Sequence, residues 1–169
     1  EELCNEKISE MEETILSIGS DKIGCFIAEP ILASGGVIVP PSGYHQRSLE
    51  LCKKHDIVYI SDETVTGFGR LGHWFASKEV FGIQPDIITC AKGLTSGYLP
   101  MGAAIISESL IDNIKNKDGS QPFTNGYTYS CHPVAAKAAL TNIDIMSRDS
   151  ILEHVRKISP HFQNRLRSL

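Results

Sequence analysis

The chain has 169 residues, of which 41% are hydrophobic and 21% charged, and its formal net charge is −4. This composition is typical of a globular domain with a buried core, and the acidic balance argues against a nucleic-acid partner. No apolar run reaches the roughly 20 residues that a membrane-spanning helix needs, and the acidic segment 1–13 differs from a signal peptide.

The spacing of the cysteines and histidines argues against disulfide bonds and against a metal site. The five cysteines are odd in number, widely spaced and without a CxxC pair, which favours reduced thiols and a cytoplasmic location. The six histidines show no metal-binding spacing such as HExxH, so we expect no metal. The chain begins without Met inside one amphipathic pattern and stops inside another, which indicates a piece of a longer protein.

Helical and strand-like segments alternate along the chain. Helices are predicted at 1–18, 44–55, 75–81, 109–116 and 133–146, and another from Ile151 that breaks or restarts at Pro160. Short apolar runs predict strands at 23–28, 57–61, 86–90 and 102–107. The alternation predicts an α/β fold. Only about ten residues join the last two strands, too few for a helical crossover, so the fourth strand is predicted to be antiparallel and the sheet mixed.

An acid and a lysine follow two consecutive strands of this predicted sheet. Asp62 closes the run 57–61, and Lys92 comes just after the run 86–90. Parallel strands would bring both side chains to the rim where open α/β sheets bind ligands. Glu63 would point the other way along its strand and is the weaker candidate.

The two residue types suit one cofactor. Lys92 has small apolar neighbours, and burial would favour the free amine that forms a Schiff base with an aldehyde. A buried Asp62 would keep a pyridine nitrogen protonated, so that the ring can accept electrons. We therefore interpret the pair as holding the two ends of pyridoxal phosphate. Simpler interpretations stay open, namely a lysine snorkelling at a strand end and an aspartate capping a turn.

Three other motifs carry weaker signals. The segment 67–70 has neither the GxGxxG nor the GxxxxGK[ST] spacing, so a nucleotide loop is not favoured. The polar loop 124–133 precedes a predicted helix and suits an anion, although simple capping by Ser130 explains it equally well. Cys131 and His132 are adjacent and lack a third orienting group, so we interpret them as structural rather than as a nucleophile and its base.

Five blocks of sequence together resemble the class III pyridoxal-phosphate aminotransferases of fold type I. The blocks are Ala28-Glu29-Pro30 with Gly35-Gly36-Val37 and Pro40-Pro41; Asp62-Glu63 with Gly67-Phe68-Gly69-Arg70; Gln84-Pro85-Asp86; Ala91-Lys92-Gly93-Leu94 with Gly97-Tyr98, Pro100 and Gly102; and Gly126-Tyr127-Thr128-Tyr129-Ser130 with His132-Pro133. Their order spans residues 23–140. The Tyr-Ser-x-His-Pro form of the last block looks most like the ω-amino acid:pyruvate branch, which includes putrescine and β-alanine transaminases.

The resemblance implies an activity and a role for each site residue. The protein would move an amino group from an ω-amino acid or amine to a keto acid such as pyruvate, by a ping-pong Schiff-base mechanism. Lys92 would be the Schiff-base lysine, Asp62 the partner of the pyridine nitrogen, Thr64 a residue against one ring face, and Thr128 a phosphate ligand. In this family that threonine serves the neighbouring subunit, which implies a homodimer. Aminomutase, decarboxylase or amine phospho-lyase chemistry, and a non-catalytic fragment, remain the alternatives.

The resemblance also implies a domain plan. Residues 1–150 would form the central and C-terminal part of a three-layer, cofactor-binding large domain with a mixed, mostly parallel sheet, and 151–169 would start the connection to a small domain. The family's N-terminal phosphate loop and ring-stacking aromatic would lie upstream, so the fragment alone is expected to be inactive. Thr64 departs from the usual valine and Cys131 from the usual glycine. The segment Ile31-Leu32-Ala33 differs from the common form with a glutamine, which leaves substrate preference open.

Overall fold

The computed structural model describes residues 1–114 and 125–169. In chain order the elements are α1 (Glu2–Ile18), η1 (Ser20–Lys22), β1 (Cys25–Ala28), α2 (Tyr44–Lys54), β2 (Val58–Asp62), α3 (Ala76–Glu79), β3 (Ile87–Cys90), η2 (Lys92–Leu94), β4 (Ala103–Ile106), α4 (Glu108–Ile114), α5 (Pro133–Arg148) and α6 (Ile151–Arg167). The end of the predicted helix 109–116 and Thr124 of the predicted polar loop lie outside the described residues.

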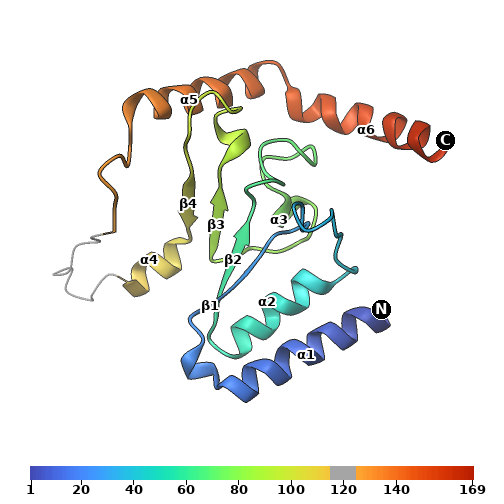
Figure 1. The fold of residues 1–169 in the computed structure, drawn as a ribbon, viewed down its shortest axis with the longest axis vertical. Coiled ribbons are helices and arrows are strands. Elements are labelled where there is room, and N and C mark those ends of the chain that lie inside the picture. The colour runs from blue at the N-terminus through green and yellow to red at the C-terminus, as the bar shows by residue number, and fades with distance from the viewer. Residues whose placement is uncertain (115–124) are drawn as a thin grey trace.

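The strands form one sheet in the order β1-β2-β3-β4 (Figure 1). Strand β1 pairs with β2 and β2 with β3 in parallel, whereas β4 runs antiparallel to β3. The predicted α/β class, the mixed and mostly parallel sheet, and the antiparallel fourth strand are all confirmed. The short connection before β4 explains its direction, because a parallel strand would have needed a longer crossover.

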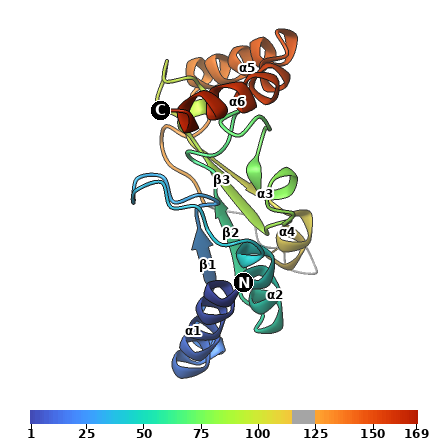
Figure 2. The same ribbon diagram turned by 90° about the vertical axis from the view of Figure 1, so that its right-hand side faces the viewer.

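One face of the sheet carries the main core. Along β2 the burial alternates, so that Tyr59 is 0% exposed while Val58 and Ile60 are half-buried. Helices α1 and α2 lie side by side next to β1 and β2 (Figures 1 and 2). The buried cluster comprises Cys4, Ile8, Ile15, Leu49, Leu51, Cys52, Ile57, Tyr59 and Ile83. Successive residues of a strand face opposite sides of the sheet. On the side away from the core, Ile27 of β1 is 57% exposed.

Two helices run beyond the carboxyl end of β3, where the predicted ligand rim lies. Helices α5 and α6 occupy this end in both views (Figures 1 and 2). The predicted break at Pro160 is wrong, because α6 continues from Ile151 to Arg167. Proline removes one helical hydrogen bond, and Pro160 and Arg156 are both exposed, so water can satisfy the freed carbonyl. None of the described helices combines the length and the apolar character needed to cross a membrane.

Candidate active site at the carboxyl rim of the sheet

Asp62 and Lys92 come to the same rim of the sheet. Asp62 is the last residue of β2, and its register partner on the parallel strand β3 is Thr89. Lys92 begins η2, and one residue, Ala91, separates it from the end of β3 at Cys90. The pairing of two parallel strand ends therefore brings an acid and a lysine to neighbouring positions, as the sequence pattern predicted.

The surroundings of Asp62 favour its ionised form. The backbone N–H of Thr64 donates to its Oδ1 at 3.0 Å. Burial raises the pKa of Asp62, but hydrogen bonds from the side chain and backbone of Thr64 and from the side chain of Thr89, together with the charge of Lys92, outweigh burial and lower the pKa below its ordinary value of 3.8. Asp62 is therefore a carboxylate at neutral pH and can accept a hydrogen bond from a protonated ring nitrogen.

Lys92 differs from the expectation that it would be buried. Its side chain is exposed, although its neighbours Ala91 and Gly93 are half-buried. The reason is that η2 leaves the sheet at this residue, whose backbone is left-handed with φ 41°. Within the described part of the chain, no hydrogen bond or ion pair holds its Nζ. A left-handed lysine is strained, and such strain persists only where the surroundings fix the backbone.

Two contacts fix the turn after Lys92. From α5, the Asn142 side chain donates to the carbonyls of Gly93 at 2.8 Å and Leu94 at 3.2 Å. From the loop after β2, Phe68 packs so closely that a Cβ on Gly93 would lie 2.8 Å from the Phe68 Cβ. Sequence reasoning missed Asn142. The available signal was an amide side chain inside the otherwise Ala-rich helix 133–146.

Glu63 does not face the rim. It is 0% exposed, and its carboxylate accepts hydrogen bonds from Thr66, Ala76 and Ser77. The prediction that it points away from Asp62 is confirmed. Its extensive hydrogen bonding was not predicted, because an irregular loop separates Glu63 from Ala76 and Ser77 at the start of α3, and the path of that loop follows no period.

A pocket of about 690 Å³ lies beside Asp62. Its lining includes Ala28 and Glu29 at the end of β1, the apolar Ile38, and Tyr44 at the start of α2. Glu29 Oε2 accepts from the N–H of Ala33 at 3.1 Å, which ties this loop together. Lys92 is not among the lining residues, so in these 169 residues the pocket adjoins the acid rather than the lysine.

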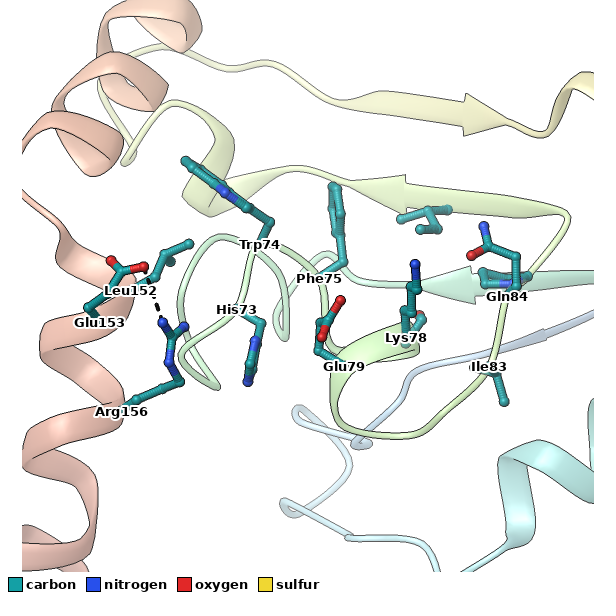
Figure 3. A pocket seen from close by; sticks show the side chains of 13 residues that line it. His73, Trp74, Phe75, Lys78, Glu79, Ile83, Gln84, Leu152, Glu153 and Arg156 are labelled. Atoms are coloured by element: carbon teal, nitrogen blue, oxygen red, sulfur yellow. Dashed lines mark hydrogen bonds and ion pairs between the residues drawn. The ribbon is translucent and has the colours of Figure 1, made fainter.

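A second pocket, of about 400 Å³, lies away from these residues (Figure 3). Trp74 and Phe75 approach it from the loop before α3, and α6 contributes the ion pair of Glu153 with Arg156 at 3.1 Å (Figure 3). None of Asp62, Thr64, Lys92 and Thr128 lines it. It is therefore separate from the rim where the chemistry is expected.

The two threonines of the predicted site lie apart. Thr64 follows Asp62 closely and binds its carboxylate. Thr128 is exposed in the loop before α5, and no hydrogen bond or ion pair within the described ranges joins it to Asp62 or Lys92. Capping of α5 by Ser130 is wrong: His132 is the N-cap and its Nδ1 accepts from Ala135 N–H at 3.5 Å. The Ser130 Oγ instead accepts from Tyr127 N–H at 2.9 Å, because the chain turns once more before the helix starts.

Comparison with known proteins gives the family. The chain matches the family Aminotransferase class-III over residues 1–169, and it belongs to this family. It is 44% identical over 161 residues to the putrescine–pyruvate aminotransferase of Pseudomonas aeruginosa, covering 95% of this chain and 34% of that protein. It is 43% identical over 166 residues to the mitochondrial gamma-aminobutyrate transaminase 1 of Oryza sativa subsp. indica, covering 96% of this chain and 32% of that protein.

Solved structures agree. A PLP-bound amine transaminase from an uncultivated Pseudomonas species superimposes with a TM-score of 0.85 at 40% identity, covering 94% of this chain and 36% of that one. The chain thus spans about a third of the length of the relatives that it matches.

The residues at the rim fit pyridoxal phosphate, the cofactor of class III aminotransferases. The fit rests on the donor set that the structure shows. Asp62 is an ionised acceptor with its backbone fixed on β2, and Lys92 is an exposed amine just beyond the adjacent strand end. These are the two groups that a pyridine nitrogen and an aldehyde require.

Proposed function

We propose that the whole protein is a PLP-dependent transaminase that moves an amino group from an ω-amino acid or amine to a keto acid such as pyruvate. The observation that carries this proposal is the placement of an ionised Asp62 and an exposed Lys92 at neighbouring parallel strand ends. When bound, the cofactor supplies an aldehyde that bonds amines and a ring that accepts electrons from the adjoining carbon.

Lys92, Asp62 and Thr64 would each have a defined role in this reaction. Lys92 Nζ would hold the cofactor, and a substrate amine would take its place there. The released Nζ would then accept a proton from the substrate carbon and later return one, as general base and acid. Asp62 would hold the proton on the ring nitrogen throughout. Thr64, bound to the Asp62 carboxylate, would lie against one face of the ring.

The names of the relatives support the transaminase over the other reactions. One is described as acting on putrescine and pyruvate and another on gamma-aminobutyrate, and in both names the amino group is transferred. We therefore favour an amine or ω-amino acid donor over aminomutase, decarboxylase or phospho-lyase chemistry. An assay of amine consumption with and without pyruvate tests this preference. Turnover that does not depend on a keto acid would contradict it.

The cofactor role of Lys92 can be tested chemically. The whole protein should gain a yellow chromophore with pyridoxal phosphate, and borohydride should fix the label on the peptide that contains Lys92. Lys92→Ala should abolish label and turnover, whereas Lys78→Ala, a matched change at an exposed lysine of α3, should leave both unchanged. Unchanged labelling and turnover in Lys92→Ala would overturn the proposal.

We also propose a homodimer in which Thr128 binds the phosphate in the neighbouring subunit. In support, Thr128 is exposed between Tyr127 and Tyr129, which are 83% and 82% exposed, and it does not contact Asp62 or Lys92 within the described chain. Exposed aromatic residues of this kind are enriched at protein interfaces.

Mixing two inactive variants tests the shared site. If Thr128 acts across the dimer, a mixed dimer of Lys92→Ala and Thr128→Ala subunits contains one intact site, and activity should return on mixing. If Thr128 acts within its own subunit, every site carries one defect and no activity returns. Sedimentation of the wild type checks the dimer itself, and a monomer would overturn this proposal.

The domain division and the location stay proposals. The division at residue 150 is supported by Ser150, whose left-handed backbone separates α5 from α6. Limited proteolysis of the whole protein near this residue would test it.

The cytoplasmic location is supported by five free cysteines, and cell fractionation tests it. We expect the 169-residue piece alone to bind cofactor weakly and to be inactive.

A further inference from the structure

Glu63 is a buried carboxylate that the proposed chemistry does not use. Its side chain is 0% exposed. Oε1 accepts from the N–H of Ser77 at 2.7 Å and from its hydroxyl at 2.6 Å. Oε2 accepts from the N–H of Ala76 at 2.9 Å and from the hydroxyl of Thr66 at 2.6 Å. Each oxygen thus binds one backbone N–H and one hydroxyl.

This arrangement requires a carboxylate. A glutamine in the same place would put its NH₂ group against a backbone N–H in either orientation, because both Ala76 and Ser77 donate from the main chain. A backbone N–H cannot become an acceptor, so one buried donor would lose its partner. The Glu63 carboxylate therefore closes the loop 63–77, which here means the irregular chain after β2 together with the first two residues of α3, and glutamine cannot form the same set of bonds.

The closed loop is joined to Asp62 through the main chain. Glu63 N–H donates to the carbonyl of Thr89 at 2.8 Å, which continues the β2–β3 pairing one residue past Asp62. Neighbouring residues on a strand face opposite sides of the sheet. Fixing Glu63 on the covered side therefore fixes Asp62 on the rim side.

The same loop reaches the turn at Lys92. Gly67 N–H donates to the Glu63 carbonyl at 2.9 Å, and Phe68 N–H donates to the Trp74 carbonyl at 2.8 Å, so the loop folds back on itself. Phe68 then packs against Gly93, where an added Cβ would lie 2.8 Å from its own. A loop closed by Glu63 thus supports the residue directly after Lys92.

We propose that Glu63 is a positioning residue whose buried carboxylate closes the loop 63–77 and thereby holds Asp62 and Lys92 in the relative arrangement that the cofactor needs. The proposal rests on the proposed function, because it assumes that these two residues bind pyridoxal phosphate. It differs from a purely stabilising role, which would change the free energy of unfolding and leave the environment of the bound cofactor unchanged.

The test compares Glu63→Gln with Glu79→Gln in the whole protein. Glu79 is an exposed glutamate of α3 in the same stretch of chain, so it is a matched control. The readouts are the dissociation constant for pyridoxal phosphate, the visible circular dichroism of the bound cofactor and the urea midpoint of the apoprotein. Glu63→Gln should weaken binding by about tenfold or more and alter the dichroism band. Glu79→Gln should match the wild type.

A milder variant covers the case in which Glu63→Gln does not fold. Thr66→Ala removes one of the four donors, and the printed bond of the Thr66 hydroxyl goes to Glu63 at 2.6 Å, so the variant should give a smaller change of the same kind. Ser77→Ala is less suitable, because the Ser77 hydroxyl also pairs with the buried hydroxyl of Ser61. A lower urea midpoint with wild-type affinity and dichroism, in Glu63→Gln or in a folded Thr66→Ala, would overturn the positioning role alone. A wild-type protein that does not bind pyridoxal phosphate would overturn the proposed function and this role with it.

Discussion

The side-chain amide of Asn142 donates to the carbonyl of Gly93 at 2.8 Å, so that α5 holds the backbone immediately after Lys92. The same amide reaches the carbonyl of Leu94 at 3.2 Å, and its oxygen accepts from the Ser96 hydroxyl at 2.9 Å. One side chain thus binds three residues of the turn. This explains how Lys92 can keep a left-handed backbone with φ 41° without a glycine.

Replacing Asn142 by alanine should loosen this turn. We expect the free energy of unfolding of the whole protein to fall by about 1–2 kcal/mol, because two partly buried carbonyls lose their donor. The affinity for pyridoxal phosphate should fall as well. Urea unfolding and a cofactor titration measure the two effects. Thr141→Ala, at an exposed neighbour on the same helix, is the control, and equal effects of both changes would contradict the role of Asn142.

The position of Asp62 and Lys92 at one rim of the sheet was predictable from the sequence. The contacts that hold these two residues in place were not. Asp62 and Lys92 end short apolar runs, and the period of a strand is enough to assign their side of the sheet. The contact of Asn142 with Gly93 joins residues 49 positions apart, and no local pattern encodes it. The bonds of Glu63 to Ala76 and Ser77 were missed for the same reason, because an irregular loop separates Glu63 from the start of α3. The exposure of Lys92 was missed because we inferred burial from its small apolar neighbours. That inference holds only inside a strand, and β3 ends at Cys90 before Lys92 is reached.

Cys131, at a position where the resemblance implies a glycine, has a left-handed backbone with φ 58°. Such a conformation costs a residue with a Cβ roughly 1–2 kcal/mol. Replacing Cys131 by glycine would remove this cost, but part of the gain is offset because glycine has more conformational freedom in the unfolded chain. Cys131→Gly should therefore raise the free energy of unfolding by about 0.5–1 kcal/mol. Thermal unfolding of the whole protein measures it. Cys131→Ala keeps the Cβ and should gain nothing, so equal gains would show that the thiol, and not the backbone, is responsible.

Thr64 stands where the resemblance implies a valine. The interaction of its hydroxyl with the Asp62 carboxylate is one of the causes that lower the pKa of Asp62 below 3.8 against the effect of burial. Because its pKa is lowered, the Asp62 carboxylate stays ionised until the pH falls through that lowered pKa, and only then does it lose the charge that would hold the cofactor. Thr64→Val should therefore shift the acid release of bound cofactor to a higher pH. Thr64→Ser keeps the hydroxyl and should match the wild type. An identical shift in both variants would contradict a role for the hydroxyl.

His45 links three elements of the fold below the rim. It is 3% exposed, and its Nε2 lies 2.9 Å from the carbonyl of Pro30 while its Nδ1 lies 2.9 Å from the hydroxyl of Tyr59. Because the carbonyl can only accept, Nε2 carries the proton and Nδ1 accepts from Tyr59. Burial lowers the pKa of His45 below 6.5, and the Pro30 carbonyl and the charge of Glu63 oppose the shift without cancelling it. The buried ring is therefore neutral at neutral pH.

This neutral ring predicts a loss of stability in mild acid. Below pH 6.5 the unfolded chain binds a proton at this position and the folded chain does not, so the free energy of unfolding must fall as the pH decreases. Urea unfolding of the whole apoprotein at about pH 7.5 and about pH 5.5 measures the change. His45→Gln removes the titrating group and should reduce the difference between the two values, whereas His154→Gln, at an exposed position of α6, should not. If the wild type and His45→Gln lost the same free energy on acidification, the proton would bind elsewhere, and the loss would have to come from the other carboxylates and histidines of the fold.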